Sequence, residues 1–295
     1  MKHKPDMSSI VYYTIGYLLV VTVALFCLLP FLLILTASFT PEALIVKNGY
    51  SLLPKNFSLE AYKMLFRYPD DTVRAYGVSI IITAFGAAIG LLITAMAAYA
   101  INRKDFKYRN AFSFYFFFIT LFNGGLVSTY IMMVRYYHLK NSLLALILPN
   151  LVNVFYVIVM RTFMNSLPDS LSESAKIDGA GDFTIFVRVI LPLTTPAFAT
   201  IGLFLALDYW NDWYNAMLYI TNYKLYPLQY LLYNMLSQVD AMTRLSAQAN
   251  ISKQSVPTES LRMAMTIIAI GPTIVLYPFV QKYFVKGITL GSVKG

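Results

Sequence analysis

Six long apolar runs alternate with short polar connections along the chain. A membrane-spanning helix needs about 20 consecutive apolar residues, and each of these runs is long enough. Backbone groups find no water in the hydrocarbon core, so such runs must be helical; they also lack the alternation of barrel strands. The runs cover residues 11–38, 76–101, 111–134, 143–164, 185–209 and 262–284. The pattern predicts an all-α membrane protein with six transmembrane helices in a single domain over residues 1–295.

Composition agrees with this pattern. The chain is 58% hydrophobic and only 13% charged, whereas a soluble domain carries about 25% charged residues. The mean hydropathy is +0.61. The net charge of +9 fits lysines and arginines that hold loops on the cytoplasmic side. Because no basic soluble patch is apparent, we expect contact with membrane lipid and no binding of nucleic acid.

One connection fixes the expected orientation. The stretch "NRKDFKYRN", residues 102–110, gathers Arg103, Lys104, Lys107 and Arg109. Short basic connections stay in the cytoplasm. An even number of spans then places both termini in the cytoplasm, and the long polar segment 211–261 becomes an outer loop that could form a small lid.

Glycine and proline modify the spans. Gly86 and Gly90 lie four residues apart, a spacing that allows close helix approach and that we assign to packing within this chain. Prolines inside apolar runs are tolerated where neighbours satisfy the freed carbonyls, and we expect kinks at some of them. Such prolines are Pro30, Pro149, Pro192, Pro196, Pro272 and Pro278.

A short charged stretch separates the fourth and fifth runs: "LPDSLSESAKIDGAGDFTIFVRVILPLTTP". Pro168 suits the first turn of a helix, Ser170 and Glu173 have the spacing of a capping box, and Gly179 is placed to end the helix in a left-handed conformation. The pattern predicts a helix over about residues 168–179 whose exposed residues are small or charged. An interfacial amphipathic helix would carry more bulky apolar residues, so a docking element for a partner protein fits better.

This stretch resembles the EAA loop of the inner-membrane permeases of ABC importers. That pattern is Glu-Ala-Ala, three residues, Gly, nine residues, Ile, one residue, Leu-Pro. The chain has the same spacing, with Ser174 in place of alanine and Val189 in place of isoleucine, both conservative in size. The "DGA" that follows is common in carbohydrate permeases of this type, and the ending "QKYFVKGITLGSVKG" resembles the tail of the maltose-type permease.

The resemblance implies a type I ABC importer permease fold with a cytoplasmic coupling helix, in the bacterial cytoplasmic membrane. The implied partners are a second homologous permease, two ATPase subunits and an extracytoplasmic solute-binding protein. The residues implied to contact the ATPase from the coupling helix and its return are Glu173, Ser174, Ala175, Asp178, Gly179, Ala180, Leu191 and Pro192. Those implied to extend between the ATPase subunits from the tail are Lys286, Gly287, Gly291 and Gly295.

Energy would come from the partner, because the chain has no G-x-x-x-x-G-K-[ST] phosphate loop. We therefore expect no enzyme activity and no cofactor here, with ATP and magnesium on the ATPase. His3 and His138 belong to no catalytic or metal-binding group. An ion-coupled secondary transporter would predict inverted repeats and broken spans that carry charge, and a membrane enzyme would predict clustered catalytic residues.

The expected solute is a sugar or oligosaccharide, since the long segment 211–261 resembles a subgroup that serves complex oligosaccharides, including uronate-rich ones. A neutral oligosaccharide and a non-carbohydrate solute such as a phosphorylated glycerol derivative stay open. Aromatic, amide and carboxylate groups suit sugars. The candidate substrate-path residues are Asn123, Asn150, Asn153, Tyr209, Trp210, Asn211, Asp212 and Trp213.

Structural roles compete with this assignment. The two tryptophans could belong to an interfacial aromatic belt, and Asn150 and Asn153 could bond between helices. Asn123, with the glycines after it, could mark a helix break.

Overall fold

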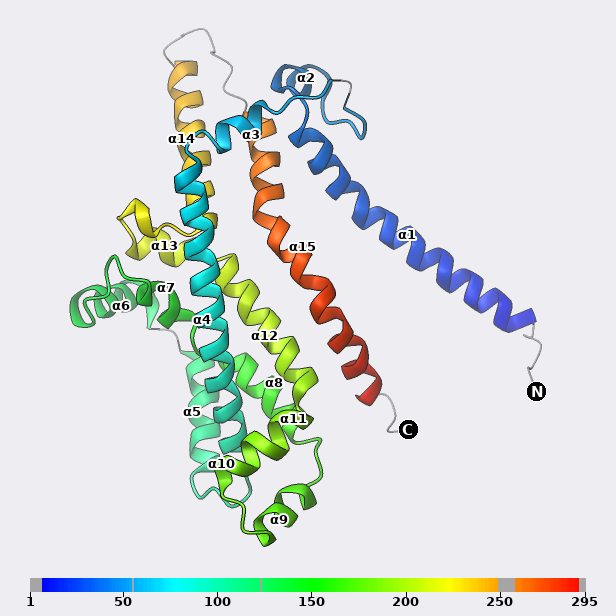
Figure 1. Cartoon of the computed structure of the whole chain (residues 1–295), viewed down its shortest axis with the longest axis vertical. Helices are drawn as coiled ribbons and strands as arrows, with labels where there is room; N and C mark the ends of the chain where they lie inside the picture. The colour runs from blue at the N-terminus through cyan, green and yellow to red at the C-terminus, as the bar shows by residue number, and fades with distance from the viewer. Residues whose placement is uncertain (1–6, 55, 123, 249–257, 292–295) are drawn as a thin grey trace. The chain divides into compact units, whose positions relative to one another are not determined.

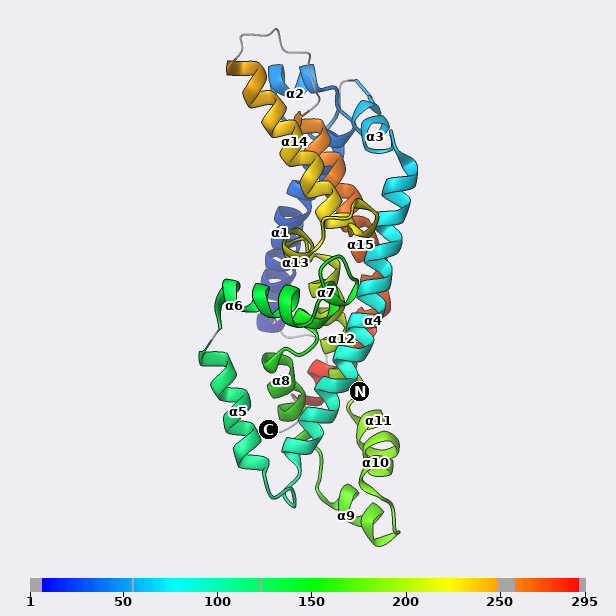
Figure 2. The same ribbon diagram turned by 90° about the vertical axis from the view of Figure 1, so that its left-hand side faces the viewer.

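The computed structural model describes residues 7–54, 56–122, 124–248 and 258–291, and all regular structure within them is helical (Figures 1 and 2). The chain divides into two compact units. The first combines Met1–Pro69 with Met235–Gly271, and the second combines Asp70–Asn234 with Pro272–Gly295. The organisation of the whole chain as a single permease domain stays a prediction.

The first unit is built from two short and three long helical segments. They are α1 (Met7–Ser38), α2 (Glu42–Asn48), α3 (Glu60–Leu65) and the adjoining parts of α14 (Leu228–Gln248) and α15 (Thr258–Gly291). The helices of the second unit before the α9 segment are α4 (Pro69–Asn102), α5 (Arg109–Leu121), α6 (Gly125–Ile131), η1 (Met132–Tyr136), α7 (Leu144–Ile147), η2 (Leu148–Asn150) and α8 (Val154–Met164). Those from α9 onward are α9 (Ser170–Ile177), α10 (Asp182–Ile185), η3 (Phe186–Ile190), α11 (Leu191–Leu193), α12 (Thr195–Trp210), α13 (Tyr214–Tyr219) and η4 (Tyr223–Leu225), with the remaining parts of α14 and α15.

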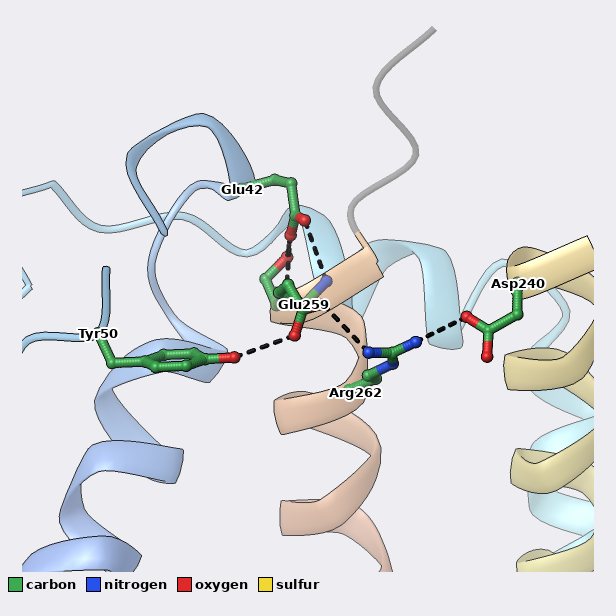
Figure 3. A network of polar contacts seen from close by, with 6 residues as sticks. Glu42, Tyr50, Asp240, Glu259 and Arg262 are labelled. Carbon is green, nitrogen blue, oxygen red and sulfur yellow. Dashed lines mark hydrogen bonds and ion pairs between the residues drawn. The ribbon is translucent and has the colours of Figure 1, made fainter. Parts of the chain in front are cut away.

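A polar network holds the first unit together at the start of α15 (Figure 3). The Glu42 carboxylate accepts hydrogen bonds from the backbone N–H groups of Glu259, at 3.0 Å, and Ser260, at 2.9 Å. These are N–H groups of the first helical turn, which have no partner inside the helix, and a carboxylate there also favours the helix dipole. Arg262 pairs with Asp240 of α14 at 2.7 Å. Residues from α2, α14 and α15 are thereby tied together.

Close packing within the second unit explains the small residues of α4. A Cβ atom added at Gly86 would lie 2.5 Å from the ring of Tyr209, and one at Gly90 would lie 2.8 Å from the carbonyl oxygen of Leu151. Tyr209 is only 1% exposed, and its hydroxyl donates to the carbonyl oxygen of Ile147 at 2.8 Å. The assignment of this stripe to packing inside the chain is confirmed.

Three of the predicted spans are not continuous helices. By length and composition, α1 from Val11 and α4 can each cross a membrane alone, and the total reaches five only when each bent helix pair is counted as one span. The pair Leu144–Asn150 and Val154–Met164 bends by 51°, and the pair Asp182–Leu193 and Thr195–Trp210 bends by 85°. The span expected at 111–134 is divided between α5 and α6. The count of six spans stays a prediction.

Proline accounts for the 85° break between Asp182–Leu193 and Thr195–Trp210. Pro196 has no N–H to donate to the carbonyl oxygen of Pro192, and the Thr195 hydroxyl donates to that oxygen instead, at 2.7 Å. At the other break Pro149 lies in a 3-10 turn, and the extended residue Asn153 starts α8 by accepting a hydrogen bond from the next turn. The kinks expected at these prolines are confirmed.

The sixth apolar run, 262–284, lies within α15, and the outer segment 211–261 holds α13, η4, all of α14 and the start of α15. The outer segment is therefore largely helical where the structure describes it. Its role as a lid stays a prediction.

Candidate functional site

The α9 helix lies at one end of the second unit, beyond α10 (Figures 1 and 2). It begins at Ser170, so the capping box predicted from Ser170 and Glu173 is wrong. The residue at the N-cap is Asp169, and no side chain caps the helix. Instead, the Asp169 carboxylate forms an ion pair with Lys104 of the 102–110 connection. The carboxylate at the cap position therefore pairs with a lysine of another segment and not with the backbone N–H groups of α9.

The end of α9 follows the predicted pattern. Gly179 has φ +79°, in the left-handed region that favours glycine. The N–H of Gly179 donates to the carbonyl oxygen of Lys176 at 3.0 Å, and the N–H of Ala180 donates to that of Ala175 at 2.9 Å. These two bonds form a Schellman motif, which satisfies carbonyls that the helix leaves open. The predicted role of Gly179 in ending the helix is confirmed.

The small residues of the motif anchor the helix. Ala175 and Ala180 are partly buried and pack against the core formed by α4, α8, α10, η3 and α12. Leu191, in α11, packs against the same core. A helix whose inner contacts are alanines sits close to its support, and its position is defined by backbone geometry rather than by flexible side chains.

The outer residues of the motif face away from this core. Glu173, Ser174, Asp178 and Pro192 are all exposed. The carboxylate of Glu173 makes no hydrogen bond or ion pair with any residue in the described part of the chain. A carboxylate presented in this way is available to a cation on another protein.

The surface around α9 is more apolar than the sequence suggested. Ile177 is 86% exposed and Phe183, just beyond the turn, is 68% exposed. The expectation that only small or charged residues are exposed is therefore wrong. The pattern missed these two because neither belongs to a repeating apolar face of a helix. Ile177 is the last bulky apolar residue before the glycine turn, and Phe183 is the first one after it.

Ion pairs connect α9 and α10 to the end of α4. Asp105 accepts from Arg103 Nε at 2.8 Å and from Lys176 of α9 at 2.5 Å. Arg103 also pairs with Asp182, the first residue of α10. The Arg103 side chain is only 16% exposed, which limits the competition from water for these bonds. The hydrogen bonds from Arg103 and then Lys176 hold the pKa of Asp105 well below its usual range, and the bond to Asp105 raises the pKa of Arg103.

A small cavity lies beside these pairs. It has a volume of about 190 Å³ and is bordered by Glu173 and Lys176 from α9 and by Tyr99 and Arg103 from α4 and the connection after it. Sequence reasoning treated Arg103 and Lys104 as orienting charges and did not consider Asp105. The signal was present in the opposite charges of two short connections, 102–110 and 168–182, that the predicted topology places on the same side.

A second, larger cavity brings together half of the predicted substrate path. It has a volume of about 750 Å³. The predicted residues that line it are Asn150, Asn153, Asn211 and Asp212. Further lining residues that were left out of that path are Ile119, Thr120, Pro149, Val152, Val154, Phe155, Leu207, Asp208, Tyr214 and Asn215.

The aromatic candidates lie elsewhere. Tyr209 and Trp210 are 1% and 6% exposed and do not line the cavity, because both are used in packing. Trp213 is stacked on Tyr233, with ring centroids 4.5 Å apart. Asn123 lies outside the described residues.

The C-terminal candidates are only partly described. Gly287 and Gly291 lie in α15, which ends at Gly291. Lys286 lies in the same helix, and Gly295 lies outside the described residues. The contact of this tail with an ATPase stays a prediction. Among the described residues, no group of three or more histidine, cysteine, aspartate or glutamate side chains could hold a metal ion.

Comparison with known proteins decides the family. Residues 90–290 match the model of the binding-protein-dependent transport system inner membrane component. The chain belongs to this family. It is therefore a membrane component of an ABC transport system, and the resemblance carried by the α9 stretch is confirmed. Bent spans near acidic residues are one feature expected of a secondary transporter, but family membership assigns the chain to ABC importers.

Its curated relatives include two from Bacillus subtilis (strain 168). The chain is 38% identical over 280 residues to the polygalacturonan/rhamnogalacturonan transport system permease protein YtcP, covering 95% of this chain and 96% of the relative. It is 40% identical over 270 residues to protein LplC, covering 91% and 90%. Among solved structures, it is similar to a chain of a bacterial ABC transporter involved in import of the acidic polysaccharide alginate. That match has a TM-score of 0.77 and 27% identity over 95% of this chain and 99% of the other. The helical fold is that of an ABC importer permease.

Proposed function

We propose that this chain is one permease subunit of an ATP-driven importer for a sugar or oligosaccharide. A second, homologous permease completes the pore, two ATPase subunits supply the energy, and an extracytoplasmic binding protein delivers the solute. Family membership supports the importer, and the names of YtcP and the alginate importer support a carbohydrate solute. Both termini and α9 lie on the cytoplasmic side, with Lys286, Gly287, Gly291 and Gly295 between the ATPase subunits.

The exposure of Glu173 carries the coupling role that we assign to α9. The helix is anchored to its own chain by Ala175 and Ala180, while Glu173 has no partner in the described part of the chain. In this proposal the Glu173 carboxylate forms an ion pair with a basic residue of the ATPase. Ile177 and Phe183 add an apolar contact around that charge, since exposed apolar side chains lose water when a partner covers them.

The ion pairs of Arg103 and Asp105 connect α9 mechanically to the membrane spans. Asp105 joins Lys176 of α9 to Arg103 at the end of α4, and Arg103 joins Asp182 of α10. When ATP closes the ATPase dimer, α9 moves with it, and these bonds move the ends of α4 and α10 in the same direction. The spans then alternate between outward and inward access, and solute shifts that equilibrium through its different affinity for the two states.

Replacement of Glu173 by glutamine tests the proposal. The Glu173→Gln chain should reach the membrane at normal levels, because the side chain is exposed, but should lose most ATP-dependent uptake. A charge-assisted hydrogen bond contributes about 1.5–3 kcal/mol, which corresponds to a loss of about tenfold or more in affinity. Co-purification of the ATPase should fall in parallel.

The matched control is Glu60→Gln, an exposed glutamate of α3. It should leave both ATPase co-purification and uptake unchanged. Normal uptake by the Glu173→Gln chain would exclude the coupling role of this residue.

A further inference from the structure

The larger cavity owes its polar lining to two helix junctions. Around Pro149 and Asn153 the span formed by α7 and α8 is interrupted, and at Asn211 α12 gives way to the loop before α13. Residues from both junctions line the same space, together with Thr120 from α5. Polar groups at such breaks are costly in a membrane unless they face a cavity. Their convergence on one space of about 750 Å³ is what a solute site requires.

The charges in this cavity have one sign. Its lining includes Asp208 and Asp212, and none of the described residues that line it is a lysine, arginine or histidine. Asp208 accepts a hydrogen bond from the hydroxyl of Tyr156 at 2.7 Å. Asp212 accepts from the side-chain amides of Asn150, at 2.9 Å, and Asn215, at 2.6 Å. Both carboxylates are therefore held in place by neutral donors.

The remaining hydrogen-bonding capacity favours a ligand that donates. The amides of Asn150 and Asn215 are directed to Asp212, and the amide of Asn211 donates to the carbonyl oxygen of Leu207 at 2.9 Å. A carboxylate accepts several hydrogen bonds and donates none when ionised. The two carboxylates thus offer acceptor oxygens to a ligand, and sugar hydroxyl groups are donors of the right kind.

Aromatic faces complete the chemistry of a sugar site. Phe155 and Tyr214 line the cavity and are 64% and 43% exposed. The apolar face of a sugar ring can cover such a surface while its hydroxyls turn to the carboxylates. A uronate would bring a further negative charge next to two that have no cation beside them, and this repulsion grows where water is excluded.

We infer that this cavity is a subsite for an uncharged sugar unit, whose hydroxyl groups donate to Asp208 and Asp212, and that it disfavours uronate. The inference rests on the proposed function, since it names the solute class for the same import reaction. The sugar unit inferred for this cavity therefore differs from the acidic units of the polymers named for YtcP and for the alginate importer.

Cysteine labelling of the assembled importer tests the subsite. The chain has a single cysteine, Cys27, so a Cys27→Ser background allows one new thiol at a chosen place. In that background, Asn211→Cys puts the thiol on the cavity, and Asn110→Cys puts it at the far end of α5 as a matched control. The complex in lipid nanodiscs, with both faces open to a maleimide, is mixed with a neutral trisaccharide of galactose or with trigalacturonate.

We expect the neutral trisaccharide to slow labelling at position 211 several-fold, trigalacturonate to leave it unchanged, and position 110 to respond to neither. Adding Asp212→Asn should weaken protection by the neutral sugar about tenfold, because a hydrogen bond to a charged group is lost. Equal or stronger protection by trigalacturonate would overturn the preference for an uncharged sugar. Absence of protection by either sugar would overturn the subsite.

The same preparation keeps this inference separate from the proposed function. If the ATPase co-purifies and the binding protein stimulates ATP hydrolysis while no sugar protects position 211, only the subsite fails. If the ATPase does not co-purify, the proposed function fails.

Discussion

At the scale of single residues, the short motif around α9 assigns a different physical task to each position. Ala175 is small because it packs against the core, and Gly179 is glycine because its φ is +79°. Glu173 is charged and exposed, with no partner among the described residues. Of these three positions, only Glu173 is proposed to contact a partner directly. Ala175 and Gly179 determine the position of α9, and so the place at which Glu173 is exposed.

Gly179→Ala should destabilise the turn after α9 by about 1–2 kcal/mol, since a residue with a Cβ atom is strained in the left-handed region. Space is not the cause, because nothing lies within 4 Å of an added Cβ atom. Gly179→Asn should cost less, because asparagine tolerates this conformation. ATP-dependent uptake and ATPase co-purification measure the effect.

Gly181→Ala is the matched control for that change. Gly181 has φ −71°, which any residue adopts, and also has open space around it. Equal loss of activity in the two alanine variants would show that the conformation of Gly179 is not what matters.

The sequence located Glu173, Ala175 and Gly179 because their reasons are local: spacing, size and backbone conformation within one turn. The network of Arg103 and Asp105 was missed because it joins residues of different connections, and no periodic pattern in one segment reveals such a pair. The buried state of Tyr209 was missed for the same reason, since it depends on Gly86 of another helix.

At the scale of elements, the hydrophobic pattern predicted where the membrane helices lie but not where they break. The apolar runs extend on both sides of Thr194 and Asn150. The length of each run therefore predicts one helix where the structure has two helices at an angle. The glycines after Asn123 were a local signal for the break between α5 and α6, and proline was an ambiguous signal for the other two. Pro30 lies inside the single helix α1, whereas Pro196 follows an 85° bend.

The pairing of α9 with the end of α4 should control coupling more than stability. Asp105 is half-exposed, so its pairs contribute no more than about 1 kcal/mol each to folding. Asp105→Asn should therefore leave the thermal unfolding temperature nearly unchanged while it lowers ATP-dependent uptake. Asp71→Asn breaks a similarly exposed pair with Arg74 inside α4 and should alter neither quantity.

The pH dependence of this pairing follows from the depressed pKa of Asp105. A carboxyl whose pKa is lowered on folding stabilises the structure above its unfolded pKa, about 3.9, and loses that contribution as the pH falls through the lower, folded value. The small stability difference between the wild-type and Asp105→Asn chains should thus be constant from pH 5 to pH 8. A difference that changes within that range would contradict the assigned ion pairs.

Contact between α4 and α12 predicts a strong effect of a small change. Gly86→Ala would bring a Cβ atom within 2.5 Å of a ring that is fully buried and fixed by its hydroxyl bond to Ile147. Overpacking of this kind costs about 1–3 kcal/mol. Thermal stability in detergent should fall for Gly86→Ala and stay unchanged for Gly77→Ala, since nothing lies within 4 Å of a Cβ atom at Gly77.

At the scale of the whole molecule, a large apolar surface of α1 is left without cover within its own unit. The most apolar window of α1 has no buried residue, and side chains such as Phe26 are 80% exposed. Membrane lipid accepts such a surface, and the second permease that we propose would accept it too. Burial within one chain therefore describes only part of the protein's folded environment.

A tagged chain purified from native membranes in mild detergent should bring with it an ATPase and a second permease, which mass spectrometry would identify. Recovery of the chain alone, with transport driven by an ion gradient in liposomes, would rule out the proposed importer. Tags at either terminus should be accessible to protease only from the cytoplasmic side; access from the outside to one of them would show an odd number of spans.

The contact of Gly86 with the ring of Tyr209 also constrains how the family can diverge. A methyl group at position 86 would lie 2.5 Å from the ring at position 209, so its cost falls once that ring has been replaced by something smaller. The favoured order of such substitutions is therefore the change in α12 before the change in α4. Relatives that retain an aromatic residue at the later position should retain glycine at the earlier one, and the two sites should be inherited as a pair.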